Sequence, residues 1–152
     1  MPRDEFRCVH KLRVRWAEVD MQRVVFNAHY LTYIDTALAE YWREIGLPYP
    51  EDYVNRYAND LFLRKATVDY LGSARYDDWL DVFCRTSRLG RSSMTMSFEV
   101  WQHDAPPDAS PLLTAELVYV NVALATIKPE ALPEEVRRRV GEYERVAPMQ
   151  AG

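Results

Sequence analysis

The sequence contains few of the residues from which metal centres and disulfide frameworks are built. Its 152 residues include 2 cysteines and 3 histidines. These form no cluster with carboxylates at ligand spacing, so we expect no metal. Cys8 and Cys84 both lie in segments of alternating apolar residues. We therefore expect them to be buried, reduced thiols rather than a disulfide or a catalytic thiol.

An excess of basic charge is also absent. The formal net charge is −4 at pH 7, which argues against a nucleic-acid-binding protein, because such proteins present a basic surface. No apolar run approaches the roughly 20 residues that a membrane helix needs. The charged N-terminus has no apolar core of the kind found in signal peptides. We expect neither nucleic acid nor membrane as a partner, and the cytoplasm as the location.

The chain does contain enough apolar material for one packed domain. Hydrophobic residues make up 48% of the 152 residues, which predicts a single domain spanning residues 1–152. Apolar side chains alternate over residues 6–16, as in a strand. Asn27 is expected to cap a helix over residues 28–45, which Gly46 and Pro48 would end. The apolar surface of that helix is wide, so we expect it to be wrapped on several sides.

Four further strands follow, and a short helix ends the pattern. The strands are predicted at roughly residues 61–71, 79–88, 92–102 and 112–124, because apolar residues there alternate or run together. A turn at Gly90 joins two of them as a hairpin. A helical turn is expected near residues 51–56 and a C-terminal helix over residues 133–145. One curved antiparallel sheet around the long helix would bury its wide apolar surface.

The most informative stretch is residues 16–30, which reads W-A-E-V-D-M-Q-R-V-V-F-N-A-H-Y. It places one carboxylate, Asp20, between a strand and the start of a helix. The stretch resembles the hotdog-fold acyl-CoA thioesterases of the 4-hydroxybenzoyl-CoA thioesterase family, in which an aromatic-x-x-x-Asp segment precedes a turn and a helix opening with His or Asn. The resemblance covers roughly residues 12–140. It implies an α+β hotdog fold, with a five-stranded curved antiparallel sheet around a long central helix and a short C-terminal helix.

The resemblance also implies an oligomeric state and the molecule that carries the acyl group. Family members form homodimers or dimers of dimers (homotetramers), and an open sheet edge favours the same on physical grounds. The substrate would be an acyl-CoA, with CoA entering as part of the substrate rather than as a retained cofactor. The acyl group stays open, as does the choice between CoA and a carrier protein.

Asp20 and Asn27 are the candidate catalytic residues. Asp20 falls at the position of the family's catalytic aspartate, where it would act as nucleophile or as general base. The alternative is a turn-forming aspartate. Asn27 matches the helix start at which a backbone N–H points at the thioester oxygen, and the positive end of the helix dipole would add to that polarisation.

Two residues depart from the family pattern. Arg23 stands where the family usually has Gly, and Val24 where it often has His. The Arg23 side chain would narrow the acyl site, pair with an acidic acyl group or point into solvent. These changes leave open how efficiently the thioester is hydrolysed.

Several further residues are candidates for substrate binding. Ala28, His29 and Tyr30 follow Asn27 in the first helical turn. Asp35 lies further along the same helix, where the alternative is a surface or dimer contact, and Glu18 is expected to be solvated. Near the CoA arm, the resemblance assigns Arg88, Arg91, Ser92 and Ser93, whose alternative is a polar hairpin turn.

Hydrolysis of an acyl-CoA to the free acid and CoA is the function that these residues predict. A non-catalytic protein that binds an acyl thioester or an aromatic acid is the alternative, because Arg23 and Val24 differ from the pattern. A hotdog dehydratase or hydratase is a further alternative. It would need a His paired with an acidic helix residue, and His29 with Asp35 matches that pattern poorly.

Overall fold

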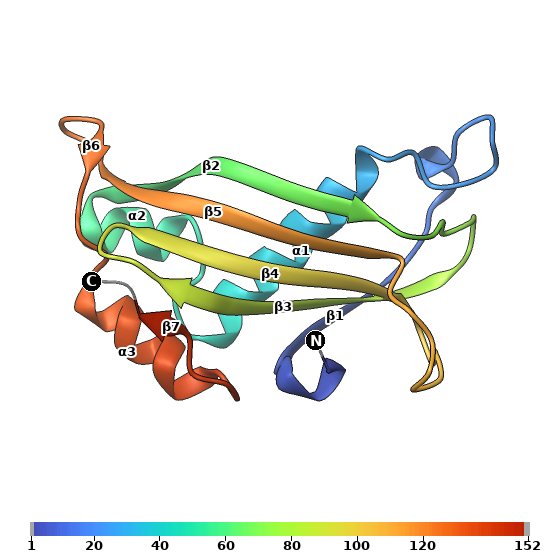
Figure 1. Ribbon diagram of the computed structural model, residues 1–152. Helices are drawn as coiled ribbons and strands as arrows, with labels where there is room; N and C mark the ends of the chain where they lie inside the picture. The colour runs from blue at the N-terminus through green and yellow to red at the C-terminus, as the bar shows by residue number, and fades with distance from the viewer. Residues whose placement is uncertain (1, 151–152) are drawn as a thin grey trace.

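A computed structural model describes residues 2–150. One curved sheet follows the strand order β1-β3-β4-β5-β2, in which all neighbours are antiparallel, and wraps around the long helix α1 (Figure 1). The strands are β1 (Cys8–Arg13), β2 (Asn59–Tyr70), β3 (Trp79–Leu89), β4 (Ser93–Gln102), β5 (Leu113–Ala123), β6 (Lys128–Pro129) and β7 (Met149–Gln150). The α-helices are α1 (His29–Glu44), α2 (Glu51–Tyr57) and α3 (Glu134–Tyr143), with short 3₁₀ turns at Arg3–Glu5 and Trp16–Glu18.

The predicted hotdog arrangement is confirmed. The five long strands, the central helix, the turn near residue 51 and the C-terminal helix all form within a few residues of their expected positions. Two short strands add to the sheet, because β6 pairs with β5 and β7 runs parallel to the end of β3. No helix within residues 2–150 is long and apolar enough to cross a membrane.

The first strand is shorter than predicted. Pairing of β1 with β3 stops at Arg13. Val14 then donates its N–H to the Asp78 carbonyl at 2.9 Å. Trp16 opens a 3₁₀ turn, and its side chain is 80% exposed. The apolar alternation over residues 6–16 therefore ends in a loop, and Trp16 faces outward instead of into the core.

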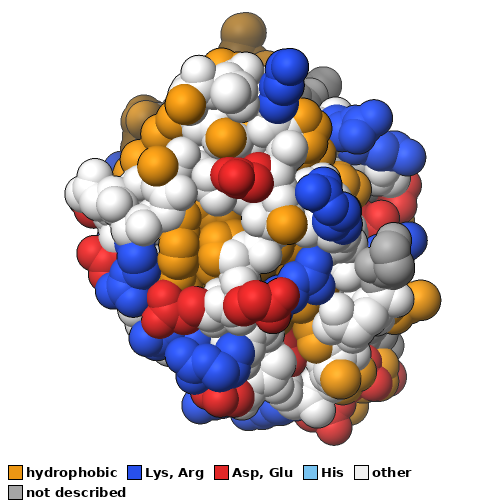
Figure 2. Space-filling model, turned by 90° about the vertical axis from the view of Figure 1, so that its left-hand side faces the viewer, with side chains coloured by type: hydrophobic (Ala, Val, Ile, Leu, Met, Phe, Trp, Pro, Cys, Tyr) orange, Lys and Arg blue, Asp and Glu red, His pale blue; other side chains and the backbone are white. Residues whose placement is uncertain are grey.

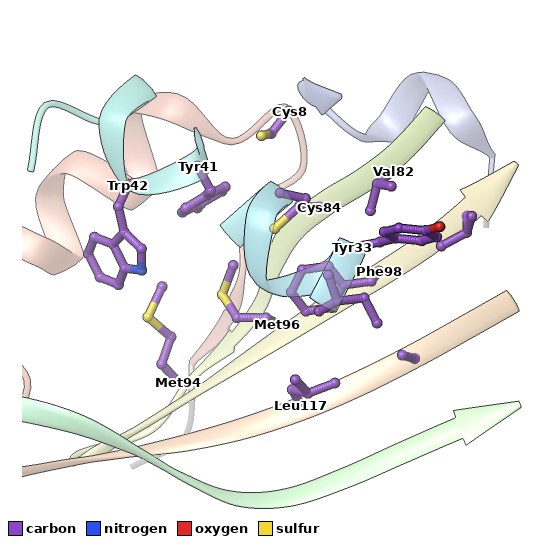
Figure 3. Packing of buried hydrophobic residues seen from close by; sticks show 14 of the residues in the cluster. Cys8, Tyr33, Tyr41, Trp42, Val82, Cys84, Met94, Met96, Phe98 and Leu117 are labelled. Atoms are coloured by element: carbon purple, nitrogen blue, oxygen red, sulfur yellow. The ribbon is translucent and has the colours of Figure 1, made fainter. Parts of the chain in front are cut away.

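The helix α1 is buried on a wide surface, as predicted. Tyr33, Ile34, Ala37, Tyr41 and Trp42 are all at most 4% exposed. They pack against side chains that β3, β4 and β5 direct toward the helix, several of which Figure 3 labels. Burying each large side chain is worth about 1.5–3 kcal/mol, so this contact stabilises both the helix and the curvature of the sheet around it.

Cys8 and Cys84 are free and buried, as predicted. They stand opposite each other in the register of β1 and β3. Burial raises the pKa of both thiols above the ordinary range. Thiolate is the nucleophilic form, so this environment makes both cysteines unreactive.

A buried carboxyl group lies at the far end of α1. Glu144 Oε2 accepts hydrogen bonds from the Tyr41 hydroxyl at 2.6 Å and from the Thr86 N–H at 2.7 Å. Its Oε1 is buried without a hydrogen-bond partner among the described residues. Burial raises the pKa of Glu144, and the Tyr41 and Thr86 hydrogen bonds offset this only in part. The folded protein therefore holds the proton of Glu144 more tightly than the unfolded chain does.

This linkage predicts the effect of Glu144→Gln. Because the folded pKa is raised, stability is lost as the pH rises through it. Glutamine keeps one acceptor oxygen and cannot ionise. We expect the melting temperature at pH 7.5 to rise by about 2–4 °C, the equivalent of ~1 kcal/mol, with the difference vanishing near pH 4. Thermal unfolding across this pH range, with the exposed Glu142→Gln as control, checks it. A variant less stable at every pH would contradict the prediction.

Candidate functional site

Asp20 lies in a small hairpin formed by residues 18–26. Val19 and Val25 form an antiparallel bridge at its centre. Asp20 donates its N–H to the Val24 carbonyl and accepts from the Arg23 N–H, each at 3.0 Å. These bonds fix the backbone of Asp20 at the turn.

The Asp20 carboxylate has one engaged oxygen and one open one. Oδ1 accepts the Gln22 N–H at 2.8 Å, so the turn-forming role left open by the sequence is present. Oδ2 accepts no hydrogen bond from the rest of residues 2–150. The side chain is therefore held at one oxygen and has the other available for chemistry.

The backbone of Arg23 adopts a left-handed conformation of the kind that glycine favours. Its φ is +65°, in the left-handed region that costs a residue with a Cβ roughly 1–2 kcal/mol. Its side chain is exposed, and within the described part of the chain its guanidinium has no ion-pair partner. The turn geometry thus accounts for the glycine that the family usually has here. Arg23 supplies a free cation beside Asp20.

A cleft of about 550 Å³ opens at this hairpin. Asp20 and Arg23 line it together with five further residues. Exposed aromatic rings border it, and Trp16 meets Tyr76 edge-on at 5.4 Å between centroids. The lining residues are Trp16, Val19, Asp20, Met21, Arg23, Arg75 and Tyr76.

The start of α1 differs from the prediction. The N-cap residue is Ala28, not Asn27, and no side chain within residues 2–150 caps the helix. The expectation that Asn27 caps with its side chain is wrong, because the chain enters the helix through a turn in which His29 donates to the Phe26 carbonyl at 2.9 Å. The Asn27 carbonyl accepts from the Tyr30 N–H and the Tyr70 hydroxyl.

That turn leaves backbone donors free. Among the described residues, neither the Asn27 N–H nor the Ala28 N–H finds an acceptor, and both residues are exposed. The first N–H groups of any helix lack partners within it and carry its positive partial charge. The Asp20 hairpin and these two donors lie at the same end of the molecule (Figure 1), because Asn27 directly follows the hairpin.

The other first-turn candidates are less open. Tyr30 is only 2% exposed, and its hydroxyl accepts the Ala74 N–H at 2.9 Å. His29 is half-buried and meets the Phe26 ring edge-on at 6.0 Å. Tyr30 therefore supports the loop at residue 74 rather than facing the cleft.

Asp35 borders a separate, mainly apolar pocket of about 250 Å³. Its carboxylate has no hydrogen-bond or ion-pair partner within the described part of the chain, and burial raises its pKa. Asp35 lies eight residues after Asn27, about 12 Å along the helix at ~1.5 Å per residue. The lining residues are Asp35, Leu38, Ala39, Trp42, Tyr49, Leu61, Met94, Met96 and Tyr119.

The candidate CoA residues Arg88, Arg91, Ser92 and Ser93 do not lie near Asp20 within one chain. They lie at the turn between β3 and β4. The Ser92 carbonyl accepts the N–H of Asn121. Asn121 lies at the end of β5 that pairs with the start of β2. The other end of β2, Tyr70, touches Asn27. A strand of this length spans roughly 35 Å. Figure 2 shows the end of the molecule that carries the β3–β4 turn, where acidic and basic side chains surround a hollow lined by hydrophobic ones.

Glu18 is the site residue that the sequence misplaced. It was expected to be solvated, but it is only 5% exposed and its carboxylate accepts the Tyr33 hydroxyl at 2.7 Å. Tyr33 lies on α1, 15 positions after Glu18. No local pattern around residue 18 therefore indicates this contact. Trp16 and Tyr76 were not predicted as site residues for the same reason, since only the folded loops bring them together.

Comparison with known proteins agrees with this fold. A protein called PA5185 from Pseudomonas aeruginosa superposes with a TM-score of 0.80 at 21% identity, over 95% of this chain and 96% of its own. A Staphylococcus aureus protein, solved in complex with CoA, also gives a TM-score of 0.80, at 17% identity over 93% of this chain and 86% of its own. At these identities the likeness establishes the hotdog fold.

Sequence comparison points the same way. The acyl-CoA thioester hydrolase YbgC from Escherichia coli is 27% identical over 125 residues, which is 82% of this chain and 89% of that protein. The family model described as "Thioesterase superfamily" matches residues 22–106. The match contains Asn27, Asp35 and Arg88 and begins two residues after Asp20. Because it spans more than half of the chain, the chain belongs to the thioesterase superfamily.

Proposed function

We propose that this protein hydrolyses an acyl-CoA thioester, R–CO–S–CoA + H₂O → R–COOH + CoA–SH. The observation that carries the proposal is that an open carboxylate oxygen on Asp20 and the free N–H groups of Asn27 and Ala28 lie at the same end of α1. Thioester hydrolysis needs both parts: a group that attacks or activates water, and donors for the negative charge that develops on the carbonyl oxygen.

Asn27 supplies the first of these donors in this proposal. Its N–H would point at the thioester oxygen, and the start of α1 adds its positive partial charge. Such a donor costs nothing to reorganise during the reaction because the turn already fixes it. Asp20 acts either as a nucleophile that forms a mixed anhydride or as a base that takes a proton from water. Both roles use the same open oxygen, Oδ2.

The acyl group is proposed to follow α1 toward Asp35. Leu31 lies between Asn27 and Asp35 at four-residue spacing, on the same stripe of the helix, and is 40% exposed. The pocket beyond it is apolar, and its volume of about 250 Å³ is slightly below the roughly 300–1,000 Å³ usual for small-molecule sites. A medium-sized acyl group suits this space. A hydroxyl on that group would give the unpartnered Asp35 carboxylate a donor.

The carrier is proposed to be CoA, bound between two copies of the chain. The long strand β2 lies at the edge of the sheet, and its outer side pairs with no other strand of the described chain. It exposes Phe62, Leu63 and Tyr70, and such an edge favours pairing with a second strand. Antiparallel pairing of β2 about a two-fold axis brings the start of one β2 beside the end of the other. The hairpin arginines Arg88 and Arg91 of one copy then approach the Asp20 cleft of the other. CoA enters as substrate, and no separate cofactor is proposed.

Mixing two inactive variants tests this assembly. Asp20→Asn lacks the carboxylate, and Arg88→Ala/Arg91→Ala lacks the cations. In a mixed dimer one of the two sites regains both, so random exchange of subunits should restore about a quarter of the wild-type activity. Turnover after co-refolding, with each variant refolded alone as control, measures the recovery. No recovery, with dimers present by sedimentation, would mean that Arg88 and Arg91 of one subunit do not complete the Asp20 site of the other.

Two other functions remain distinguishable. A binding protein is favoured by Arg23 and Val24, and it would bind acyl-CoA without releasing thiol. A dehydratase is disfavoured, because His29 and Asp35 lie six residues, about 9 Å, apart along α1. Free-thiol release from short, long, hydroxylated and aromatic acyl-CoAs tests the proposal. Release from at least one class supports it, whereas binding without release, or hydration of an enoyl-CoA, overturns it.

A further inference from the structure

We propose that Glu18 is a positioning residue, which fixes the Asp20 hairpin to α1 through Tyr33 and so sets the distance between the Asp20 carboxylate and the helix N-terminal donors. The inference rests on the proposed thioesterase function. It assigns a task to a buried carboxylate that the chemistry itself does not use.

The contacts of Glu18 reach both sides of the hairpin base. Its Oε1 accepts the Tyr33 hydroxyl and the Arg15 N–H, each at 2.7 Å, and its Oε2 accepts Arg15 Nε at 2.8 Å. Its backbone carbonyl accepts the Phe26 N–H at 2.9 Å. One residue therefore holds the chain entering the hairpin, the chain leaving it and the helix that follows.

A second set of hydrogen bonds holds the other strand of the same hairpin, at Val25. The Val25 N–H donates to the Ala74 carbonyl at 2.8 Å, and the Ala74 N–H donates to the Tyr30 hydroxyl at 2.9 Å. Tyr30 and Tyr33 meet edge-on with centroids 5.8 Å apart. Two tyrosines on the first turns of α1 thus hold both strands of the hairpin, and the direct link is the one through Glu18.

The electrostatics keep this link in its charged form. Burial alone would raise the pKa of Glu18, but hydrogen bonds from the Arg15 backbone, from Tyr33 and from the Arg15 side chain lower it below the ordinary value. The Tyr33 pKa is raised, by burial first and then by Glu18. At neutral pH a carboxylate therefore faces a phenol that keeps its proton, which is the stronger kind of hydrogen bond.

The position of Asp20 relative to α1 depends on this contact, because the other bonds of Asp20 lie within the hairpin itself and its tip packs against nothing else within residues 2–150. Met21 is fully exposed, and Gln22 and Arg23 are also exposed. Only Val19 separates Glu18 from Asp20 in the chain. A shift of Glu18 at the base of the hairpin would therefore also shift the Asp20 carboxylate. A displacement of about 1 Å in a reacting group is enough to lower turnover ~100-fold.

Tyr33→Phe tests the inference, because it deletes only the hydroxyl. We expect kcat to fall about 10–100-fold with KM within about twofold. Tyr53→Phe is the matched control. Tyr53 is equally buried and donates to Asn121 Oδ1 at 2.7 Å, near the opposite end of β2. It should lower the melting temperature by a similar amount and leave kcat unchanged.

Two further measurements separate the possible failures. In the Asp20→Asn background, Tyr33→Phe should have no additional effect, since there is no carboxylate left to position. If Tyr33→Phe and Tyr53→Phe lower the melting temperature alike and neither changes kcat, the positioning role is wrong while the thioesterase proposal stands. If Asp20→Asn itself retains full activity, the proposed catalytic role of Asp20 is wrong, and the positioning role of Glu18 is wrong with it.

Discussion

Asp20→Asn is expected to lower kcat at least about 100-fold on every acyl-CoA that the protein hydrolyses, with little change in KM. The amide keeps an oxygen that accepts the Gln22 N–H, so the turn around Asp20 survives. What it loses is the negative charge of the open oxygen, which either attacks the thioester or removes a proton from water. Rates of thiol release by wild type and variant, at matched concentrations of folded protein, measure the effect.

The control for Asp20→Asn is Asp108→Asn, which makes the same chemical change in an exposed loop. It should leave the rate within about twofold of wild type, as surface substitutions generally do. Activity in Asp20→Asn within tenfold of wild type would mean that the carboxylate is a turn residue only. The open oxygen would then have no catalytic role, and the search for the base would move to Asp35.

Asn27→Pro is expected to lower kcat/KM about 100–1,000-fold, the usual cost of losing one oxyanion donor. Proline removes the backbone N–H at residue 27 together with the asparagine side chain. The turn from Phe26 to His29 has its hydrogen bond at 2.9 Å, and Ala28 adopts φ −66° and ψ −25°. Residue 27 is the second residue of this turn, and the Ala28 angles resemble those of a type I turn, in which the second residue favours proline.

Asn27→Ala is the matched control, because it deletes the side chain and keeps the N–H. Since the side chain does not cap the helix, we expect less than about a threefold loss of activity and an unchanged melting temperature. Equal losses in Asn27→Pro and Asn27→Ala would assign the effect to the side chain. Retention of activity in folded Asn27→Pro would exclude the Asn27 N–H as the donor.

The elements of this fold could be predicted because their residues repeat at short range. Met94, Met96, Phe98 and Val100 alternate in the sequence, and all four are buried in the core cluster that contains the buried side chains of α1. Gly46 follows the helix with φ +85°, as a C-terminal glycine does. A period of two or of 3.6 residues needs only neighbouring positions, so the sequence alone indicates strand, helix and the apolar face of each.

Burial on the other face of the sheet needed the tertiary structure. Trp101 alternates out of phase with the β4 core positions, yet it is only 6% exposed. The N-terminal segment covers it, with Phe6 in the same cluster and the Arg3 guanidinium 4.0 Å from its ring centroid. Almost 100 positions separate these residues, so no periodicity records the contact.

The candidate site divides in the same way. The spacing of Asp20 and Asn27 around a turn is local, and the sequence determined by itself that a carboxylate would stand beside the start of a helix. Only the fold decided that Glu18 is buried against Tyr33, that a turn rather than the Asn27 side chain begins the helix α1, and that Arg88 and Arg91 lie one strand length away from Asp20. The physical reason is that hydrogen-bond partners and buried surfaces are chosen by proximity in space, which the order of residues along the chain does not reveal.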